Sequence, residues 1–392
     1  MYNIHSHYEN IFLQLKNIVT YPRLLYLLPY GSTRPENLER ISIDMESHNL
    51  LPLNARERHE SLKSSPMFLF YDQEPIYGEY NYHLFDYVKN NFQGPFILVT
   101  TEKNSTPLET IKKKYGWPVV YNFHHAFASH DWYRGYKYNS ELISPNKRSL
   151  DKKYISFNRL TSNARVYRSI LISELVKRNL LDQGFVSYND VCPDGGSYQD
   201  NLDQAVINRL ITPELAEEVK SNISSVKLPL RIDYQDQEFI PNHSFVLSAV
   251  EQTQRSFCYL VTETCYWESK YHLTEKIFKP IVSRMPFVLV GPVHNLKYLR
   301  EYGFKTFGKW IDESYDDIED PIERMLAIGS TMEKICSHTL EELESMLAEM
   351  QEVLDYNYNL FYSNEFLDVC WDELITNLKD SLQHLPNVQH PV

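Results

Sequence analysis

The stretch SFCYLVTETCYWESKYHLTEKIFKPIVSRMPFVLVGP, residues 256–292, decides the fold class. It contains two short apolar runs, at 256–264 and 287–292, with a polar cluster and an amphipathic segment between them. Two apolar runs separated by a helical segment predict a strand–loop–helix–strand unit with parallel strands. Lys276 falls in the first turn of the predicted helix, where the helix dipole disfavours positive charge. A negatively charged ligand at this helix start would explain the lysine.

Apolar runs and helical segments alternate along most of the chain. In the first third, strands are predicted at 24–31, 67–75, 95–101 and 118–123, with helices at 79–90 and 107–115. After a polar stretch at 138–153, interpreted as a linker, strands are predicted at 153–160 and 185–188 and helices at 163–180, 213–220 and from Pro321 onward. Runs that are apolar on both faces indicate parallel strands covered by helices. The sequence therefore predicts a doubly wound α/β fold.

The composition limits the classes of protein to consider. The 392 residues are enough for about two domains, since a domain holds roughly 100–200 residues. The 39 Lys and Arg against 52 Asp and Glu give a net charge of −13, which disfavours nucleic acid, because phosphate binding needs a basic face. The five cysteines form no CxxC pair, and the N-terminus carries no apolar leader. We therefore expect a reduced, cytoplasmic protein without a membrane span.

Several motifs of known chemistry are absent from the sequence. It contains no GxxxxGK[ST], no GxGxxG, no GxSxG and no D-x-D triplet, which argues against P-loop, dinucleotide, nucleophile-elbow and metal-bound sugar-nucleotide sites. His124, His125 and His130 form the densest histidine group, in a region interpreted as a strand. Because adjacent strand residues point to opposite faces, no metal site is expected there.

A second helix start rich in cations is predicted after the strand at 153–160. Asn163, Arg165 and Arg168 lie in its first turns, and the polar residues before them are good N-caps. A helix start at the carboxyl edge of a parallel sheet, with added cations, suits a phosphate group. The alternative is that each cation is a solvated surface residue. Two such starts in one α/β region favour the phosphate-binding interpretation.

Three carboxylates lie at the ends of predicted strands. Glu263 closes the strand at 256–264, where it either accepts hydrogen bonds from sugar hydroxyls or serves as a strand-end cap. Asp72 and Glu74 close the strand at 67–75. A carboxylate at the carboxyl end of a strand is well placed to act as a general base.

Taken together, these residues resemble the donor-binding signature of the α1,3-fucosyltransferase family. That signature is a glutamate at a strand end, then Tyr-hydrophobic-Thr-Glu-Lys, then a strand ending in Gly-Pro. The residues that match it in order are Glu263, Tyr271, Thr274, Glu275, Lys276, Gly291 and Pro292. The segment SNARVYRSILISEL, 162–175, resembles the family's Ser-Asn…Ala-Arg-Val segment, in which Arg165 takes the phosphate-contacting position.

The first part of the chain resembles the family more loosely. FLFYDQEPIYGEY, 68–80, is similar to the family's strand that ends in Glu-Ser-Pro, whose glutamate is the base. If Pro75 is the aligned proline, Gln73 takes the place of that glutamate, which leaves Glu74, Asp72 and then Glu79 as candidates. The family's Phe-Glu-Asn is also replaced, by Thr-Glu-Thr around Glu263.

The resemblance implies a glycosyltransferase-B fold, in which two Rossmann-like domains face each other across a cleft. The implied ranges are an acceptor-side domain at 1–145, a donor-binding domain at 146–330 and C-terminal helices at 331–392. The donor would be a nucleotide-diphospho-sugar, with a GDP-sugar favoured, and its phosphates would lie near Arg165 and Lys276. No metal and no other cofactor is expected.

The implied reaction is an inverting transfer of fucose or a similar sugar to a glycan or another hydroxyl acceptor. Glu74 or Asp72 would be the base, while Asn163, Glu263 and the residues around Lys276 would bind the donor. Two alternatives stay open at this point. One is a non-catalytic module of the same fold that binds a nucleotide sugar or a glycan. The other is a glycosyltransferase that acts on modified nucleic acid.

Overall fold

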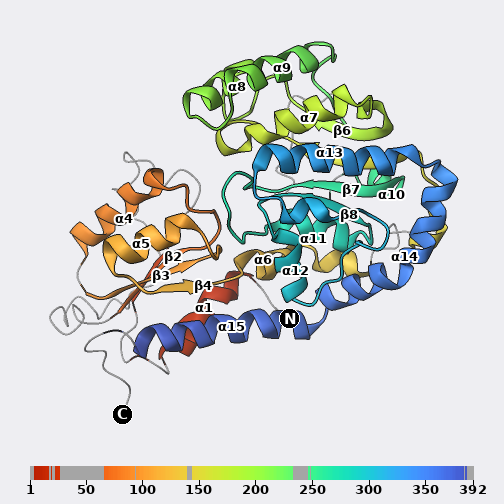
Figure 1. Ribbon diagram of the computed structural model, residues 1–392. Coiled ribbons are helices and arrows are strands. Elements are labelled where there is room, and N and C mark those ends of the chain that lie inside the picture. Colours follow the sequence, from red (N-terminus) through yellow and green to blue (C-terminus); the bar gives the residue numbers. More distant parts are fainter. Residues whose placement is uncertain are drawn as a thin grey trace. The chain divides into compact units, whose positions relative to one another are not determined.

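The computed structural model describes residues 4–16, 19, 23–26, 66–92, 94–138, 144–232, 246–247, 249–383 and 385. The chain divides into two compact units (Figure 1). Unit 1 is Met1–Asp131 together with Leu367–Val392, and unit 2 is Trp132–Phe366. The domain ranges expected from the sequence stay a prediction. None of the helices formed by the described residues is both long enough and apolar enough to cross a membrane.

Unit 1 is built on a parallel sheet with strand order β1-β2-β3-β4. Its strands are β1 (Arg23–Tyr26), β2 (Met67–Tyr71), β3 (Phe96–Thr100) and β4 (Val119–Tyr121). The predictions for the last three strands are confirmed, although each strand is shorter than its apolar run. The strand predicted at 24–31 includes β1, and residues 27–31 lie outside the described residues.

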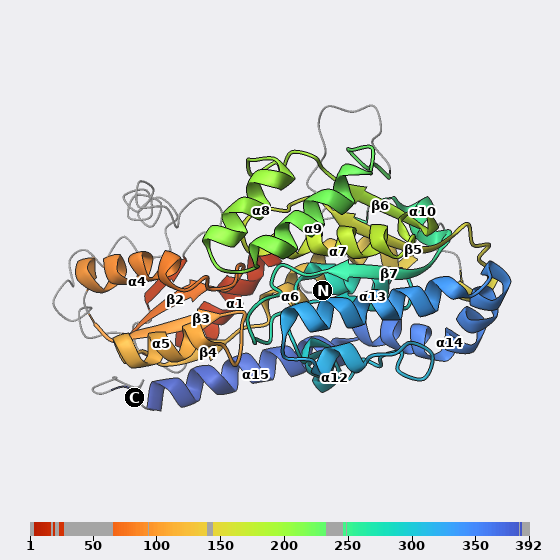
Figure 2. The same cartoon turned by 45° about the horizontal axis from the view of Figure 1, so that its top comes forward.

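Alternate residues of β2 face opposite sides of the unit 1 sheet, as expected for a buried strand. Met67, Leu69 and Tyr71 belong to a core with α4 (Glu79–Asn91) and α5 (Thr106–Tyr115). Phe68 and Phe70 belong to a second core with α1 (Ile4–Lys16) and α15 (Asn364–Gln383). The sheet is therefore covered by helices on both faces, and the last helix of the chain completes the first unit (Figure 2).

Unit 2 is built on a parallel sheet with strand order β6-β5-β7-β8. Its strands are β5 (Lys152–Asn158), β6 (Gly184–Tyr188), β7 (Ser256–Thr262) and β8 (Phe287–Val290). The crossover from β5 to β6 runs in the opposite direction to that from β7 to β8. Since crossovers between parallel strands are right-handed, their helices lie on opposite faces of the sheet. These helices are α7 (Tyr167–Lys177) and α11 (Glu275–Val282), as Figure 1 shows.

Further helices of unit 2 pack around α7 and α11. Helix α9 (Pro213–Ser224) contacts both α7 and α8 (Tyr198–Ile207), and α14 (Leu340–Phe361) packs against α11. The remaining helical segments are η3 (Arg134–Tyr138), η4 (Pro145–Lys147), η6 (Leu181–Gln183), α10 (Val250–Gln254), α12 (Asn295–Glu301), η8 (Ser314–Asp317) and α13 (Pro321–Ser337). The expected doubly wound α/β pattern is thus present in unit 2, with helices to the end of the described chain.

Four details differ from the sequence predictions. The helix expected at 163–180 starts as a 3-10 turn, η5 (Asn163–Val166), and its α-helical part ends at Lys177. The helix predicted at 213–220 runs on to Ser224. The predicted linker at 138–153 ends inside β5, and its residues 139–143 lie outside the described residues.

The fourth difference concerns the histidine group. The residues after β4 form α6 (His124–Trp132), so the interpretation of this region as a strand was wrong. Asn122 and Phe123 separate the strand from the helix. The sequence analysis placed both residues in the strand, because they continue the run at 118–123. His124 and His125 therefore begin a helix at the carboxyl edge of the unit 1 sheet. That edge is where ligands bind in open α/β sheets.

Candidate functional site

The loop between β7 and α11 in unit 2 is organised by Glu263. This side chain is fully buried, at 0% exposure. Its Oε1 accepts a hydrogen bond from the Thr274 backbone N–H (3.2 Å), and its Oε2 accepts bonds from Thr274 Oγ1 (2.6 Å) and the Thr264 backbone N–H (3.2 Å). Burial raises the pKa of Glu263, while the Lys276 charge and the Thr274 hydroxyl lower it. Glu263 thus holds the N-cap residue of α11, and its predicted contact with a sugar hydroxyl stays a prediction.

Lys276 is the second residue of α11 and follows the N-cap residue Thr274 by two positions. Its Nζ is 3.1 Å from Thr264 Oγ1, 3.1 Å from Thr274 Oγ1 and 3.0 Å from Glu275 Oε1. The side chain is 28% exposed, whereas the Glu275 side chain is 9% exposed. The helix dipole disfavours a lysine at this position, and the ion pair with Glu275 offsets part of that unfavourable interaction. The partly exposed Lys276 side chain belongs to the first turn of α11, and a cation at the N-terminal end of a helix suits an anion.

The second predicted helix start is less helical than expected. Asn163 is exposed and adopts a left-handed backbone conformation with φ of 53°, at the beginning of η5. Arg165 is half-buried within the same 3-10 turn. The turn is tied to the β7–α11 loop, because Trp267 Nε1 donates a hydrogen bond to the Ala164 carbonyl over 2.9 Å. Both helix starts therefore border the residues that follow β7.

Arg168 was grouped with the phosphate-binding cations, and the structure contradicts this. The residue is 4% exposed. Its guanidinium donates hydrogen bonds to the carbonyls of Leu160 (2.9 Å), Thr262 (3.0 Å) and Glu263 (3.1 Å). A guanidinium has five N–H donors and no acceptor, so backbone carbonyls satisfy it well. Arg168 therefore joins α7 to the end of β7 through hydrogen bonds. Its position in the sequence did not predict this structural role.

Tyr271 also has a packing role in the structure. Its ring is stacked on that of Tyr298, with centroids 4.9 Å apart and an interplanar angle of 21°. Tyr298 belongs to α12, the helix after β8. Contact of Tyr271 with a donor nucleotide stays a prediction. The predicted group thus divides into two. Glu263, Thr274, Glu275 and Lys276 form a hydrogen-bonded set, whereas Tyr271 stacks on α12, and Asn163 and Arg165 lie in η5.

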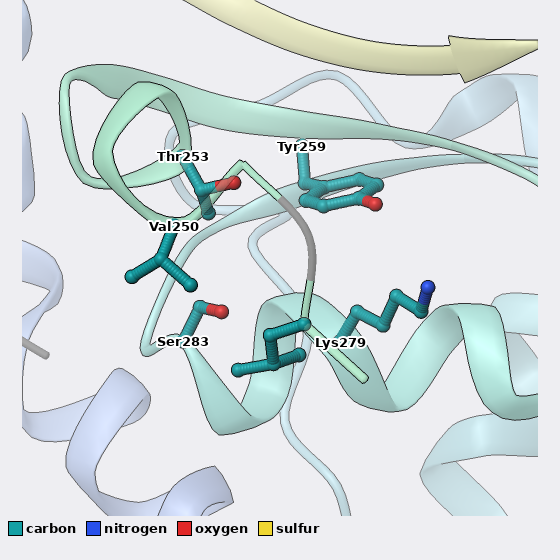
Figure 3. A pocket seen from close by; sticks show the side chains of 6 residues that line it. Val250, Thr253, Tyr259, Lys279 and Ser283 are labelled. Atoms are coloured by element: carbon teal, nitrogen blue, oxygen red, sulfur yellow. The ribbon is translucent and has the colours of Figure 1, made fainter. Parts of the chain in front are cut away.

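A small pocket lies one turn further along α11. It is lined by Leu247, Val250, Thr253, Tyr259, Lys279 and Ser283. In Figure 3, Lys279 extends from α11 below the Tyr259 ring. Burial lowers the pKa of Lys279 to about 8, with Glu275 acting in the opposite direction. The sequence analysis missed Lys279, since its neighbours Phe278 and Pro280 gave the segment an apolar character.

The carboxyl edge of the unit 1 sheet holds a second group of polar residues. Asp72 follows β2 and is 1% exposed. Its carboxylate accepts hydrogen bonds from Asn122 Nδ2 (2.6 Å to Oδ2) and from Tyr8 Oη (3.0 Å to Oδ1 and 3.2 Å to Oδ2). Burial raises the pKa of Asp72 to about 7, against the lowering effect of these hydrogen bonds.

His124 adjoins this buried carboxylate. Its Nδ1 is 3.1 Å from Tyr8 Oη and 3.8 Å from Asp72 Oδ2. Burial, reinforced by His125 and His7, holds the pKa of His124 well below its usual value. The Asn122 amide also contacts His7 Nε2 at 3.4 Å. The sequence analysis considered His124 only as a metal ligand, and the turn after β4 was the signal that would have placed it beside Asp72.

Glu74, the other predicted base, lies in the loop after β2 and is half-buried. Buried contacts fix this loop on both sides. His125 Nε2 donates to the Gln73 carbonyl over 2.9 Å, and Glu102 Oε2 accepts from the Ile76 backbone N–H over 2.9 Å. The loop is therefore held rigidly at the sheet edge. In the part of the chain that the structure describes, no three His, Cys, Asp or Glu side chains are grouped as metal ligands.

Comparisons with known proteins return one weak similarity. No family model matches the sequence, and no curated protein matches it at a significant level. Among solved structures, the chain is similar to a chain of the "Crystal structure of GtfA/B complex", with 10% sequence identity and a TM-score of 0.36. The match covers 96% of this chain and 61% of that chain, so this chain spans about three fifths of its length. Similarity at this level carries no conclusion about fold or activity.

Proposed function

We propose that this protein is an inverting glycosyltransferase that moves fucose or a similar sugar from a nucleotide-diphospho-sugar to a hydroxyl acceptor. A GDP-sugar is the favoured donor, and no metal is required. The observation that carries the proposal is the position of Lys276, whose Nζ contacts Thr264 and Thr274 at the start of α11. The signature around this lysine is the part of the chain that most closely resembles the fucosyltransferases.

The diphosphate of the donor would lie against the start of α11. There it would meet the Lys276 ammonium and the positive end of the helix dipole, at the carboxyl edge of a parallel sheet. Arg165, half-buried in η5, would supply a planar fork for phosphate oxygens from the other side of the β7–α11 loop. The Glu263–Thr274 bonds support this arrangement by fixing the helix start.

Sugar transfer of this kind requires a cation near the leaving group and a base near the acceptor hydroxyl. The departing nucleoside diphosphate gains negative charge as the bond to the sugar breaks, and fixed cations stabilise that charge. The acceptor hydroxyl loses a proton, which requires a base. Asp72 and Glu74 follow β2 in unit 1 and were the predicted bases. Of these, Asp72 is 1% exposed and accepts hydrogen bonds from Tyr8 and Asn122, whereas Glu74 is half-buried, so Glu74 is the favoured base.

A nucleotide panel tests this proposal without knowledge of the acceptor. GDP, UDP, CDP and ADP are titrated into the full-length chain by calorimetry, in the presence of a chelator. Binding of one diphosphate, with GDP as the expected one, supports a donor site that needs no metal. If none of the four binds with a Kd below about 1 mM, roughly −4 kcal/mol, the proposal is wrong.

A further inference from the structure

The 3-10 turn η5 carries Arg165 and has little support from its own residues. Its N-cap residue, Ser162, makes no side-chain capping hydrogen bond, and Asn163 adopts the left-handed backbone conformation. A 3-10 helix also has poorer hydrogen-bond geometry than an α-helix. The position of η5, and with it that of Arg165, therefore depends on contacts with other parts of unit 2.

The β7–α11 loop beside this turn is held much more firmly, at Tyr266. The Tyr266 side chain is 1% exposed, and its ring is stacked on that of Tyr167, with centroids 4.5 Å apart and an interplanar angle of 16°. Its hydroxyl donates a hydrogen bond to the Pro321 carbonyl (2.6 Å), and its own carbonyl accepts one from Arg324 Nη2 (2.8 Å). The loop is thus fixed on α7 and α13 directly before Trp267.

Trp267 joins this fixed loop to η5. Its indole Nε1 donates a hydrogen bond of 2.9 Å to the carbonyl of Ala164, the residue before Arg165. An indole ring has a single hydrogen-bond donor, so this bond uses the whole polar capacity of the side chain. Trp267 is half-buried, and Glu268 and Ser269 after it are exposed. The tryptophan therefore lies at the surface of unit 2, where it connects a fixed segment with a weakly supported one.

Arg165 and Lys276 both act on residues at the end of β7. The Tyr167 hydroxyl donates a hydrogen bond to the Glu263 carbonyl. Burial raises the pKa of Tyr167, while the charges of Arg168 and Arg165 lower it. The Lys276 charge acts in the same way against the raised pKa of Glu263. The two cations therefore act on two residues that are hydrogen-bonded to each other.

We propose that Trp267 is a positioning residue of the donor site, which holds η5 so that Arg165 binds the same diphosphate as Lys276. The inference rests on the proposed function and adds to it a residue that acts through another one. A cation on a weakly held turn would have to be ordered when the ligand binds, and that ordering lowers the affinity. The bond from Trp267 to Ala164 orders the turn in advance.

A double-mutant cycle separates this positioning role from a general effect on stability. GDP is titrated by calorimetry into the full-length chain, with a chelator present. Trp267→Phe keeps an aromatic ring and removes the N–H group, and we expect it to bind GDP at least about fivefold more weakly than the wild type. In an Arg165→Ala background the same substitution should change the Kd by less than about twofold, since the arginine that Trp267 positions is then absent.

Trp310→Phe is the matched control for this cycle. Trp310 Nε1 also donates a hydrogen bond of 2.9 Å, to Glu349 Oε2 on α14, so the two substitutions remove the same kind of group. Trp310→Phe should bind GDP as the wild type does. Wild-type affinity in Trp267→Phe overturns the proposal. A loss of the same size with and without Arg165 also overturns it, because Trp267 would then act on something other than Arg165.

Hydrogen exchange of the wild type covers the case in which Trp267→Phe fails to fold. GDP should slow the amide exchange of residues 163–166 and of residues 274–277 together. It should also slow the exchange of the Trp267 indole N–H, and an indole exchange rate that GDP does not change would contradict the positioning role. Protection of the α11 start without protection of η5 would likewise overturn the proposal, since Arg165 would then not bind the diphosphate held by Lys276.

Failure of the proposed function looks different from failure of this inference. If the wild type does not bind GDP, the donor-site proposal fails and the role of Trp267 fails with it. If the wild type binds GDP and Lys276→Ala binds it more weakly, while Trp267→Phe equals the wild type, the donor site stands. Trp267 would in that case serve only the structure of the loop.

Discussion

Thr274 Oγ1 donates a hydrogen bond of 2.6 Å to Oε2 of Glu263, and this bond joins the end of β7 to the start of α11. The same hydroxyl oxygen accepts from the Lys276 ammonium at 3.1 Å. A single threonine therefore connects a buried carboxylate with the partly exposed cation of the proposed donor site. The position of Lys276 depends on this connection.

Thr274→Val should destabilise unit 2, because it removes one donor from the buried Glu263 and leaves its oxygen underpaired. The expected loss in the free energy of unfolding is about 1–3 kcal/mol, measured by chemical denaturation. Thr110→Val is the control, since the hydroxyl of the half-buried Thr110 donates a solvent-exposed hydrogen bond to the Thr106 carbonyl on α5. A loss below about 0.5 kcal/mol would mean that the Glu263–Thr274 bond does not hold the helix start.

Arg168→Met should destabilise the fold because three backbone carbonyls at the end of β7 and before η5 lose their donor. Since hydrogen bonds to charged groups contribute about 1.5–3 kcal/mol each, we expect a loss of at least about 2 kcal/mol. Arg209→Met, at an exposed arginine, provides the comparison. If Arg168→Met were as stable as the wild type and lost only GDP binding, the original phosphate-binding interpretation would be correct.

The stability of the protein should depend on pH through Asp72. Its pKa is raised by burial to about 7, so the folded state keeps a proton that the unfolded state releases near pH 4. Stability from this group therefore falls as pH rises from about 4 to about 7 and is level above that. Each unit of raised pKa corresponds to about 1.4 kcal/mol.

The measurement is the difference in unfolding free energy between the wild type and Asp72→Asn at several pH values. His7, whose pKa burial lowers to about 4, changes stability in the opposite direction, and this contribution cancels in the difference. The wild type should lose at least about 1.4 kcal/mol relative to the variant between pH 4.5 and 7.5. A difference that does not vary with pH would show that Asp72 is not buried as described.

Arg165→Ala should reduce the turnover of GDP-fucose at least tenfold, or about 1.4 kcal/mol of transition-state stabilisation. The reason is the loss of a planar cation beside the departing diphosphate. Arg209→Ala is the matched control on an exposed loop. Wild-type kcat/KM in Arg165→Ala would remove this arginine from the donor site.

Much of the architecture could be predicted from local patterns. The strand–helix–strand unit at 256–292 was recognisable because its apolar runs are short and its helix start carries the Thr274 cap. Helix α4 was predicted to within one residue at its end. These features depend on neighbours in the sequence, which periodicity and capping describe well.

The site was harder to predict, because its contacts join distant parts of the chain. Arg168 and Arg165 are three residues apart, yet one satisfies backbone carbonyls inside the fold and the other is only half-buried. His124 meets Tyr8 across 116 positions. Only the packing of α1 against the sheet brings these two side chains together. Sequence spacing contains no information on such pairs.

The most direct test of the donor site is calorimetric binding of GDP to the wild type and to Lys276→Ala, with a chelator present. Lys309→Ala, at an exposed lysine of unit 2, is the control. We predict that the wild type and Lys309→Ala bind GDP with equal Kd, and that Lys276→Ala binds at least about tenfold more weakly, or 1.4 kcal/mol. Equal binding of GDP by Lys276→Ala and the wild type would contradict the account, since no diphosphate would then lie at the start of α11.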